Sequence, residues 1–168
     1  MKVFLFALGM LAGVVQAQET DALFPFLISY DGPTNATSMA HLLDAPAGKQ
    51  CFVRVVNGRF ATAQGPIRFN GSNLTGAGNF PSHAEADKLA GRLARLGINC
   101  IRMHHMDTYW KWQGLIADDP ATQRSFNPAM LERMDYLVYA LKQRGIYVNI
   151  NLHVGRWWDE RDGFGSRN

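Results

Sequence analysis

Several features that define common protein classes are scarce in this sequence of 168 residues. It holds two cysteines and no Cys-x-x-Cys pair, so a structural zinc site is not expected. Lys and Arg number 17 against 14 Asp and Glu and form no cluster, which argues against a nucleic-acid partner. No apolar run is long enough to span a bilayer. What is present is a globular composition, 47% hydrophobic and 11% aromatic, which suffices for one core.

The longest apolar run, Val3–Val15, has the character of a secretory signal. Lys2 precedes it, and Val15-Gln16-Ala17 places small residues where a signal peptidase cuts. We therefore expect residues 1–17 to be a signal peptide and the protein to be secreted or periplasmic, with no membrane association after cleavage. A buried N-terminal helix or a membrane anchor is the alternative.

The two cysteines, Cys51 and Cys100, both lie in apolar, strand-like runs. An oxidising compartment would allow them to form one disulfide. Buried free thiols, which behave as small hydrophobic side chains, are the interpretation that we favour.

Residues 18–65 are expected to form an N-terminal extension that contains a β-hairpin. Two short apolar runs, Cys51–Val56 and Arg59–Ala61, flank the pair Asn57-Gly58. Asn-Gly readily adopts the positive φ angles of a type I′ turn, which joins two antiparallel strands. Such a hairpin would close one end of the domain that follows.

Residues 66–168 alternate between strand and helix patterns. The first helix is expected to begin at a capping box of Ser82 and Glu85 and to end at Gly97; the second begins at Asn127-Pro128 and ends at Gly145. The strands are expected at residues 67–74, 98–103 and 146–152. This order predicts parallel strands joined by right-handed crossovers, as in doubly wound sheets and (β/α)8 barrels. The glycine-rich phosphate loops of nucleotide-binding folds are missing.

Polar residues stand where the predicted strands end. Asn73 closes the first strand, Arg102 and His104 the second, and His153 the third. Because the carboxyl ends of parallel strands meet at one edge, we expect these side chains to face a common cleft. Arg102 would hold a carboxylate through two parallel hydrogen bonds, and His104 and His153 would donate to hydroxyls of a sugar.

Four tryptophans lie in predicted loops near this edge, where they would stack on the apolar faces of sugar rings. We select Trp110 and Trp157 as substrate-binding residues, and Trp112 and Trp158 accompany them. Packing beneath a long loop is the alternative for all four.

Three stretches of the sequence resemble secreted glycoside hydrolases of the cellulase type, family 5 and its clan A relatives. They are residues 52–55 leading to 67–75, residues 93–107, which include Ile98-Asn99-Cys100-Ile101-Arg102-Met103-His104, and residues 145–153. The resemblance implies an α/β fold of the (β/α)8 TIM-barrel type. A complete barrel needs about 250 residues, so we expect an incomplete one, with the first three strands and two helices after the hairpin lead-in.

The resemblance also implies an activity, namely retaining hydrolysis of O-glycosidic bonds in β-linked glycans, with a polysaccharide or oligosaccharide as substrate. We expect no cofactor and no metal. Retention needs two carboxyl groups about 5–5.5 Å apart, which the family places after its fourth and seventh strands. None of the glutamates matches these positions; they are Glu19, Glu85, Glu132 and Glu160. We therefore expect this chain to be inactive by itself. Arg102 is carried over as support for the nucleophile, and His153 as a residue of the sugar cleft.

Three other interpretations remain open. A non-catalytic carbohydrate-binding module would use the same cleft edge and aromatic residues. A metal-dependent hydrolase would use His104, His105, Asp107 and His153 as ligands, although their spacing matches no common metal motif. In the third interpretation, the chain does not fold stably alone, because the outer strands of an incomplete barrel have open edges.

Overall fold

The computed structural model describes residues 35–107, 114–117, 125–154 and 158–165. Outside these residues lie the expected signal peptide and three of the four tryptophans, Trp110, Trp112 and Trp157. Two three-stranded sheets are present, one antiparallel and one parallel. Among the described helices, none is both long and apolar enough to cross a membrane.

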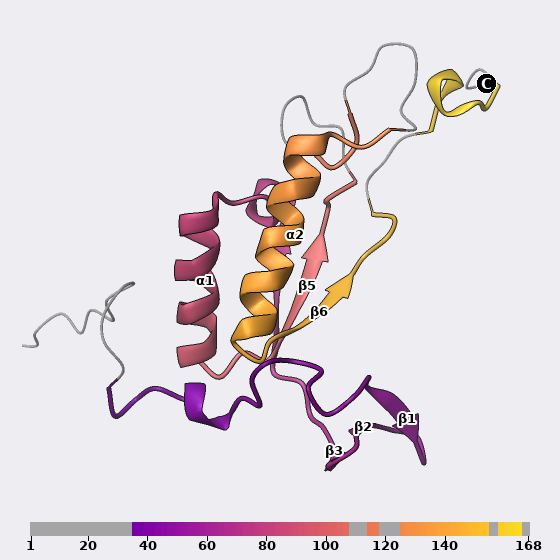
Figure 1. Cartoon of the computed structure of the whole chain (residues 1–168). Coiled ribbons are helices and arrows are strands. Elements are labelled where there is room, and N and C mark those ends of the chain that lie inside the picture. Colours follow the sequence, from indigo (N-terminus) through magenta and orange to yellow (C-terminus); the bar gives the residue numbers. More distant parts are fainter. Residues whose placement is uncertain (1–34, 108–113, 118–124, 155–157, 166–168) are drawn as a thin grey trace, which may run out of the picture.

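The parallel sheet and its two helices form the main unit. Its strands are β4 (Gly71–Thr75), β5 (Cys100–His104) and β6 (Tyr147–Ile150), in that order. The helices α1 (His83–Arg95) and α2 (Pro128–Gln143) connect the strands and lie side by side on one side of the sheet (Figure 1). The predicted order of strand, helix, strand, helix, strand is confirmed. The described residues form no closed barrel.

Local signals in the sequence set the helix ends. The Ser82 side chain accepts a hydrogen bond from the Glu85 backbone, and the Glu85 carboxylate accepts one from the Ser82 backbone. Asn127 caps α2, with Pro128 in its first turn. Gly97 and Gly145 follow the two helices with φ of 70° and 79°, a left-handed conformation that a side chain would strain. The predicted starts and ends of both helices are confirmed.

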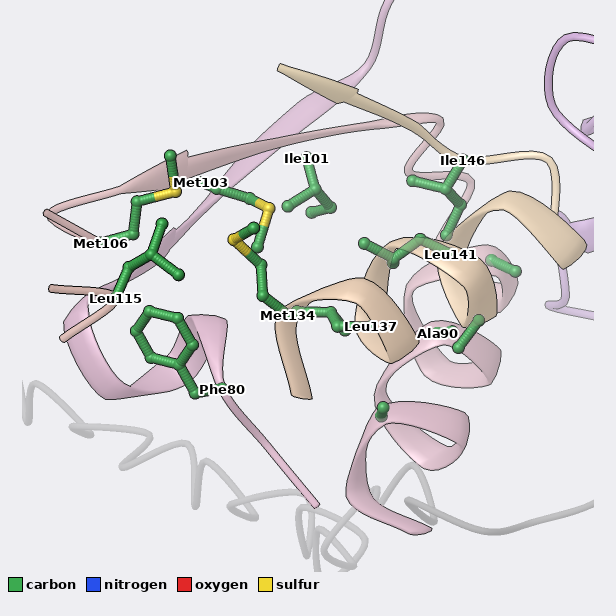
Figure 2. Close-up of a cluster of buried hydrophobic side chains, with 13 residues drawn as sticks. Phe80, Ala90, Ile101, Met103, Met106, Leu115, Met134, Leu137, Leu141 and Ile146 are labelled. Carbon is green, nitrogen blue, oxygen red and sulfur yellow. The ribbon is translucent and has the colours of Figure 1, made fainter. Parts of the chain in front are cut away.

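The core lies between the helices and one face of the parallel sheet (Figure 2). Strand β5 contributes Ile101 and Met103, and α2 contributes Leu137 and Leu141; all four are fully buried. The buried face of α1 is made of three alanines, Ala86, Ala90 and Ala94. Small side chains there let α1 pack directly against α2. The helix layer therefore covers one face of the sheet and leaves the alternate residues of the strands on the other face.

The lead-in forms a three-stranded antiparallel meander. Strands β1 (Arg54–Val56) and β2 (Arg59–Thr62) are joined by Asn57 and Gly58, both with positive φ, which confirms the predicted hairpin. Strand β3 (Gly65–Pro66) adds a third, unpredicted strand. The meander lies near the amino ends of β5 and β6 (Figure 1).

Aromatic rings link the meander to the parallel sheet. Phe60 contacts Phe69, and Phe69 contacts Tyr147 at the start of β6, with ring centroids 5.6 and 5.7 Å apart. Both contacts have the edge-to-face geometry that aromatic pairs favour. The meander thus packs against the end of the sheet opposite to the expected cleft.

The expectation that both cysteines are buried in strands was wrong for Cys51. Cys51 precedes β1, is exposed and has a φ of 91°, whereas Cys100 begins β5 and is half-buried. Both thiols are free. Burial raises the pKa of the Cys100 thiol, which keeps it protonated and weakly reactive.

The capping box of α1 provides a first prediction. Replacing Ser82 with Ala is expected to lower the free energy of unfolding by about 1 kcal/mol, because a helix N–H loses its acceptor. Hydrogen bonds from Ser82 lower the pKa of Glu85. The part of the stabilisation that depends on the Glu85 charge is therefore present above the ordinary glutamate pKa and is lost as the pH falls through the lowered one.

Urea denaturation of the wild type and of Ser82→Ala between pH 7 and pH 3 measures both effects. The stability difference between the two proteins should narrow toward pH 3. A difference that is constant over this range would contradict the role given to the Glu85 charge. Ser72→Ala, at an exposed position in β4, is the matched control.

Candidate functional site

The face of the parallel sheet that lies away from the helices is polar. On β5, Ile101 and Met103 are buried against the helices, while Arg102 between them is exposed. The strand register aligns Arg102 with Asn73 of β4 and Asn149 of β6. One register step further, Thr75 is aligned with His104. Asn151, two residues beyond Asn149, follows the end of β6. We call this set the polar face; it comprises Asn73, Thr75, Arg102, His104, Asn149 and Asn151.

Three of the predicted site residues therefore share one face. Asn73 and Arg102 are direct register partners on neighbouring strands, and His104 lies two residues beyond Arg102 on the same strand. Residues two apart in a strand point to the same side of a sheet, so the three side chains project together. The spacing of residues in the sequence did not show that Asn73 is aligned with Arg102 or that Asn149 belongs to the polar face.

His104 has a defined hydrogen-bonding role at the end of β5. The Asn151 amide nitrogen lies 3.2 Å from Nδ1 of His104, so this nitrogen accepts and the hydrogen of a neutral ring is on Nε2. Partial burial, and then the charges of His105 and Arg102, hold the pKa of His104 below its ordinary value. His104 is therefore neutral at pH 7 and presents an N–H donor.

His105 does not follow the alternation expected for a strand residue. Its φ is 54°, and β5 has already ended at His104. The two imidazole rings contact each other edge to face, with centroids 4.3 Å apart. Because β5 ends at His104, the alternation of side chains between the two faces of a strand does not extend to His105.

Asn79 is a site residue that sequence reasoning missed. It ends the short 3-10 helix η2 (Gly76–Asn79) and is fully buried. Its amide donates to the carbonyl oxygens of Gly76, at 3.0 Å, and His104, at 2.8 Å. These two bonds tie the loop after β4 to the end of β5. The signal available in the sequence was an asparagine next to a large aromatic residue, Phe80, which the structure shows to be buried.

Asp107 joins the loops that follow β5 and β6. Its Oδ2 atom accepts the Val154 backbone N–H at 3.1 Å and lies 3.5 Å from Nδ1 of His153. The other side of the His153 ring faces Trp158, whose indole nitrogen lies 3.5 Å from Nε2. His153 thus stands at the carboxyl end of the sheet, as predicted, between a carboxylate and an indole.

Of the four tryptophans, Trp158 can be placed. Its ring lies beside His153 and Phe164, with centroids 5.5 and 5.6 Å away. The roles of Trp110 and Trp157 fall outside the described residues and stay predictions. Within the described ranges, no three His, Cys, Asp or Glu side chains form a group that could hold a metal ion, so the metal-dependent alternative gains no support from His104, His105, Asp107 and His153.

These features define a class of protein. Parallel strands with helices on one face and polar side chains at their carboxyl ends are the arrangement of α/β barrel enzymes, which bind substrates at that end. The sequence model of the family described as Cellulase (glycosyl hydrolase family 5) matches residues 61–168, well over half of the chain. The chain belongs to this family, as the resemblance indicated. Searches of curated proteins and of solved structures returned no match.

Proposed function

We propose that this chain supplies the first three strands and two helices of a secreted barrel that hydrolyses β-linked glycans with retention, and that its polar face is part of the sugar cleft. The observation that carries the proposal is the alignment of Asn73, Arg102 and Asn149 across three parallel strands. In a (β/α)8 barrel, the face away from the helices is the interior, which opens at the carboxyl ends into the active site. Membership of the cellulase family supports a polysaccharide substrate.

Arg102 is proposed to support the nucleophile. Its guanidinium projects from the middle strand, between two amide side chains. A planar fork of N–H donors binds a carboxylate in two parallel hydrogen bonds and keeps it ionised. His104, with its N–H donor, and His153 are proposed to bind sugar hydroxyls beside it.

The catalytic carboxylates are proposed to come from later strands of the same barrel. Retention needs two carboxyl groups about 5–5.5 Å apart across the scissile bond. Glu85 is engaged in the capping box of α1, and Glu132 of α2 binds His83 at 2.6 Å, so both belong to the helix layer. Glu160 lies in the short helix η3 (Glu160–Asp162). The 168-residue chain is therefore expected to bind a glycan without cleaving it.

The test of this function is glycan binding combined with a hydrolysis assay. The full chain should migrate more slowly in a native gel that contains soluble mixed-linkage β-glucan than in one that contains amylose. It should release no reducing sugar from the same β-glucan. Equal migration in both gels would contradict the sugar cleft, and cleavage with inversion at the anomeric carbon would contradict a retaining enzyme.

The Arg102→Ala variant measures the contribution of the polar face. The 168-residue chain lacks the proposed nucleophile, so in this chain the Arg102 guanidinium would donate to the glycan itself. Loss of this donor, worth about 1.5 kcal/mol, is expected to weaken β-glucan binding about tenfold. Arg133→Ala, at an exposed position on α2, is the matched control and should bind like the wild type. Equal affinity of the two variants would contradict the placement of the cleft.

Sequencing the transcript past codon 168 separates a barrel from a non-catalytic binding module. The proposal expects coding sequence for further strand–helix units, with an Asn-Glu pair after the next strand. A stop codon directly after Asn168, together with glycan binding, would favour the binding module.

A further inference from the structure

Three Asn-x-Ser/Thr triplets, the sequence that N-linked glycosylation requires, lie in the described part of the chain. They begin at Asn35, Asn70 and Asn73. The proposed function makes the protein a secreted one, and in secreted proteins such triplets are acceptors for glycans where they lie in surface loops. A glycan is bulky and hydrated, so the acceptor amide must reach solvent and must not be held by the fold. The structure therefore discriminates among the three asparagines.

The side-chain amide of Asn70 is used by the fold. Asn70 directly precedes β4, and its Nδ2 atom donates to the carbonyl oxygen of Gly97 at 3.1 Å. Its backbone N–H donates to Oδ1 of Asn99 at 2.7 Å, and its backbone oxygen accepts the Asn99 N–H at 3.0 Å. These bonds join the start of β4 to the start of β5. A sugar on Nδ2 would have to fit between Asn70 and the Gly97 turn, which are already in contact.

Asn73 is excluded by its place in the sheet. It lies within β4, and its register partner in β5 is Arg102, so both side chains project from the polar face. In the proposed barrel this face is the interior, which is filled by side chains. A branched glycan on Asn73 would occupy the space of the remaining strands.

Asn35 differs from both. It is exposed and precedes the short 3-10 helix η1 (Ala40–Leu42). Its Oδ1 atom accepts two hydrogen bonds from Thr37, one from the hydroxyl at 2.8 Å and one from the backbone N–H at 3.0 Å. A backbone N–H can only donate, so the atom that it contacts is the amide oxygen. The amide nitrogen, which carries the sugar in an N-linked glycan, has no hydrogen bond to any residue that the structure describes.

The turn at Asn35 is attached to the end of the molecule that lies away from the proposed cleft. The Ser38 backbone N–H donates to the Asn35 carbonyl oxygen at 3.0 Å and closes the turn. The next residue, Met39, donates its N–H to the carbonyl oxygen of Arg95, the last residue of α1, at 2.9 Å. Helix α1 ends near the amino ends of the strands (Figure 1). A glycan on Asn35 would therefore leave the carboxyl end of the sheet open.

We propose that Asn35 is an N-glycosylation site of this protein and that Asn70 and Asn73 stay unmodified in the folded chain. This inference rests on the secretion that is part of the proposed function. The donor is an oligosaccharide carried on a polyprenyl diphosphate. Nδ2 of Asn35 forms a bond to the anomeric carbon, the bond from this carbon to the diphosphate oxygen breaks, and the polyprenyl diphosphate leaves with the electron pair. The amide nitrogen loses one proton in the same reaction.

The test is expression of the full chain, with residues 1–17, in a eukaryotic secretory host. Peptide-N-glycosidase removes an N-linked glycan and converts its asparagine to aspartate, which mass spectrometry of peptides detects. We expect this conversion at Asn35 and at neither Asn70 nor Asn73 in the secreted protein. An unmodified Asn35, a glycan at either of the other two positions, or a chain that is not secreted would overturn the proposal.

Substitutions separate the triplet from its surroundings. Asn35→Gln and Thr37→Ala should each abolish the glycan, and their mobility in a denaturing gel should equal that of the digested wild type. Thr37→Ser should keep the glycan, because serine supplies a hydroxyl at the same position. Ser72→Ala destroys the triplet at Asn70 and is the matched control, so it should keep the full shift in mobility. A glycan that persists in Asn35→Gln would refute the assignment.

This proposal and the proposed function fail separately. The digested and undigested forms should bind β-glucan with equal affinity, because Asn35 lies at the end of the sheet opposite to the cleft. A glycan on Asn35 without β-glucan binding by either form would support the modification and contradict the glycan-binding function. Binding of β-glucan by a secreted chain without a glycan on Asn35 would keep the function and refute the modification.

Discussion

Replacing Leu141 with Ala is expected to lower the free energy of unfolding by about 3 kcal/mol. Leu141 is fully buried at the carboxyl end of α2, in the core shared by both helices and β5. Truncation removes the transfer free energy of the lost carbon atoms and leaves a cavity that a close-packed core refills only in part. Urea denaturation followed by circular dichroism measures the change.

Leu42→Ala is the matched control for this substitution, because Leu42 is 69% exposed. An exposed position should change the free energy of unfolding by no more than about 0.5 kcal/mol. Equal effects at both positions would show that α2 does not pack against the sheet in solution. A wild-type chain without a cooperative transition would support the interpretation that this piece does not fold stably alone.

Replacing Asn79 with Leu is expected to cost about 2–4 kcal/mol. The substitution removes the two hydrogen bonds that the buried Asn79 amide donates to the carbonyl oxygens of Gly76 and His104 and places an apolar side chain against these oxygens. Because one bond holds the end of β5, the variant should also alter the imidazole resonances of His104. Thermal unfolding measures the loss of stability, and ¹H–¹⁵N NMR spectra of the imidazole measure the change at His104.

Asn79→Asp sharpens this prediction, because it keeps the shape of the side chain and removes the donor. Its carboxylate would face two carbonyl oxygens in a buried site, which raises the pKa of the new acid. A raised folded-state pKa means that the native state binds a proton more tightly than the unfolded state, so the stability of this variant should recover as the pH falls. A stability deficit that does not change between pH 7 and pH 4 would contradict the donor role of Asn79.

Local elements of this fold could be predicted where a local interaction sets them. The Ser82–Glu85 capping box, the cap at Asn127 and the glycines at 97 and 145 act within a few residues, so the sequence shows them directly. The Asn57-Gly58 turn is of the same kind. Strand β3 escaped prediction because two residues carry no periodicity. The burial expected for Cys51 failed because an apolar neighbourhood in sequence did not become a strand.

The candidate site likewise has residues that the sequence predicted and residues that it did not. Arg102, His104 and His153 were identified because residues at the carboxyl ends of parallel strands meet in this class of fold. The residues that contact them or lie beside them in the sheet were not identified from the sequence. Asn79, Asn149 and Asn151 are ordinary asparagines in the sequence, and Asp107 was considered only as a metal ligand. Their roles depend on contacts between segments about 25 to 47 residues apart in the chain.

The sequence by itself determined the helix boundaries, the alternation that makes the strands parallel and the family to which the chain belongs. These depend on short-range patterns and on residue identity. Only the tertiary structure decided which side chains share a face and which residues each histidine contacts. Strand register aligned Asn73 with Arg102, and the fold placed Asn151 beside His104 and both Asp107 and Trp158 beside His153. The proton on an imidazole follows its neighbours in space, and the order of residues in the chain does not specify them.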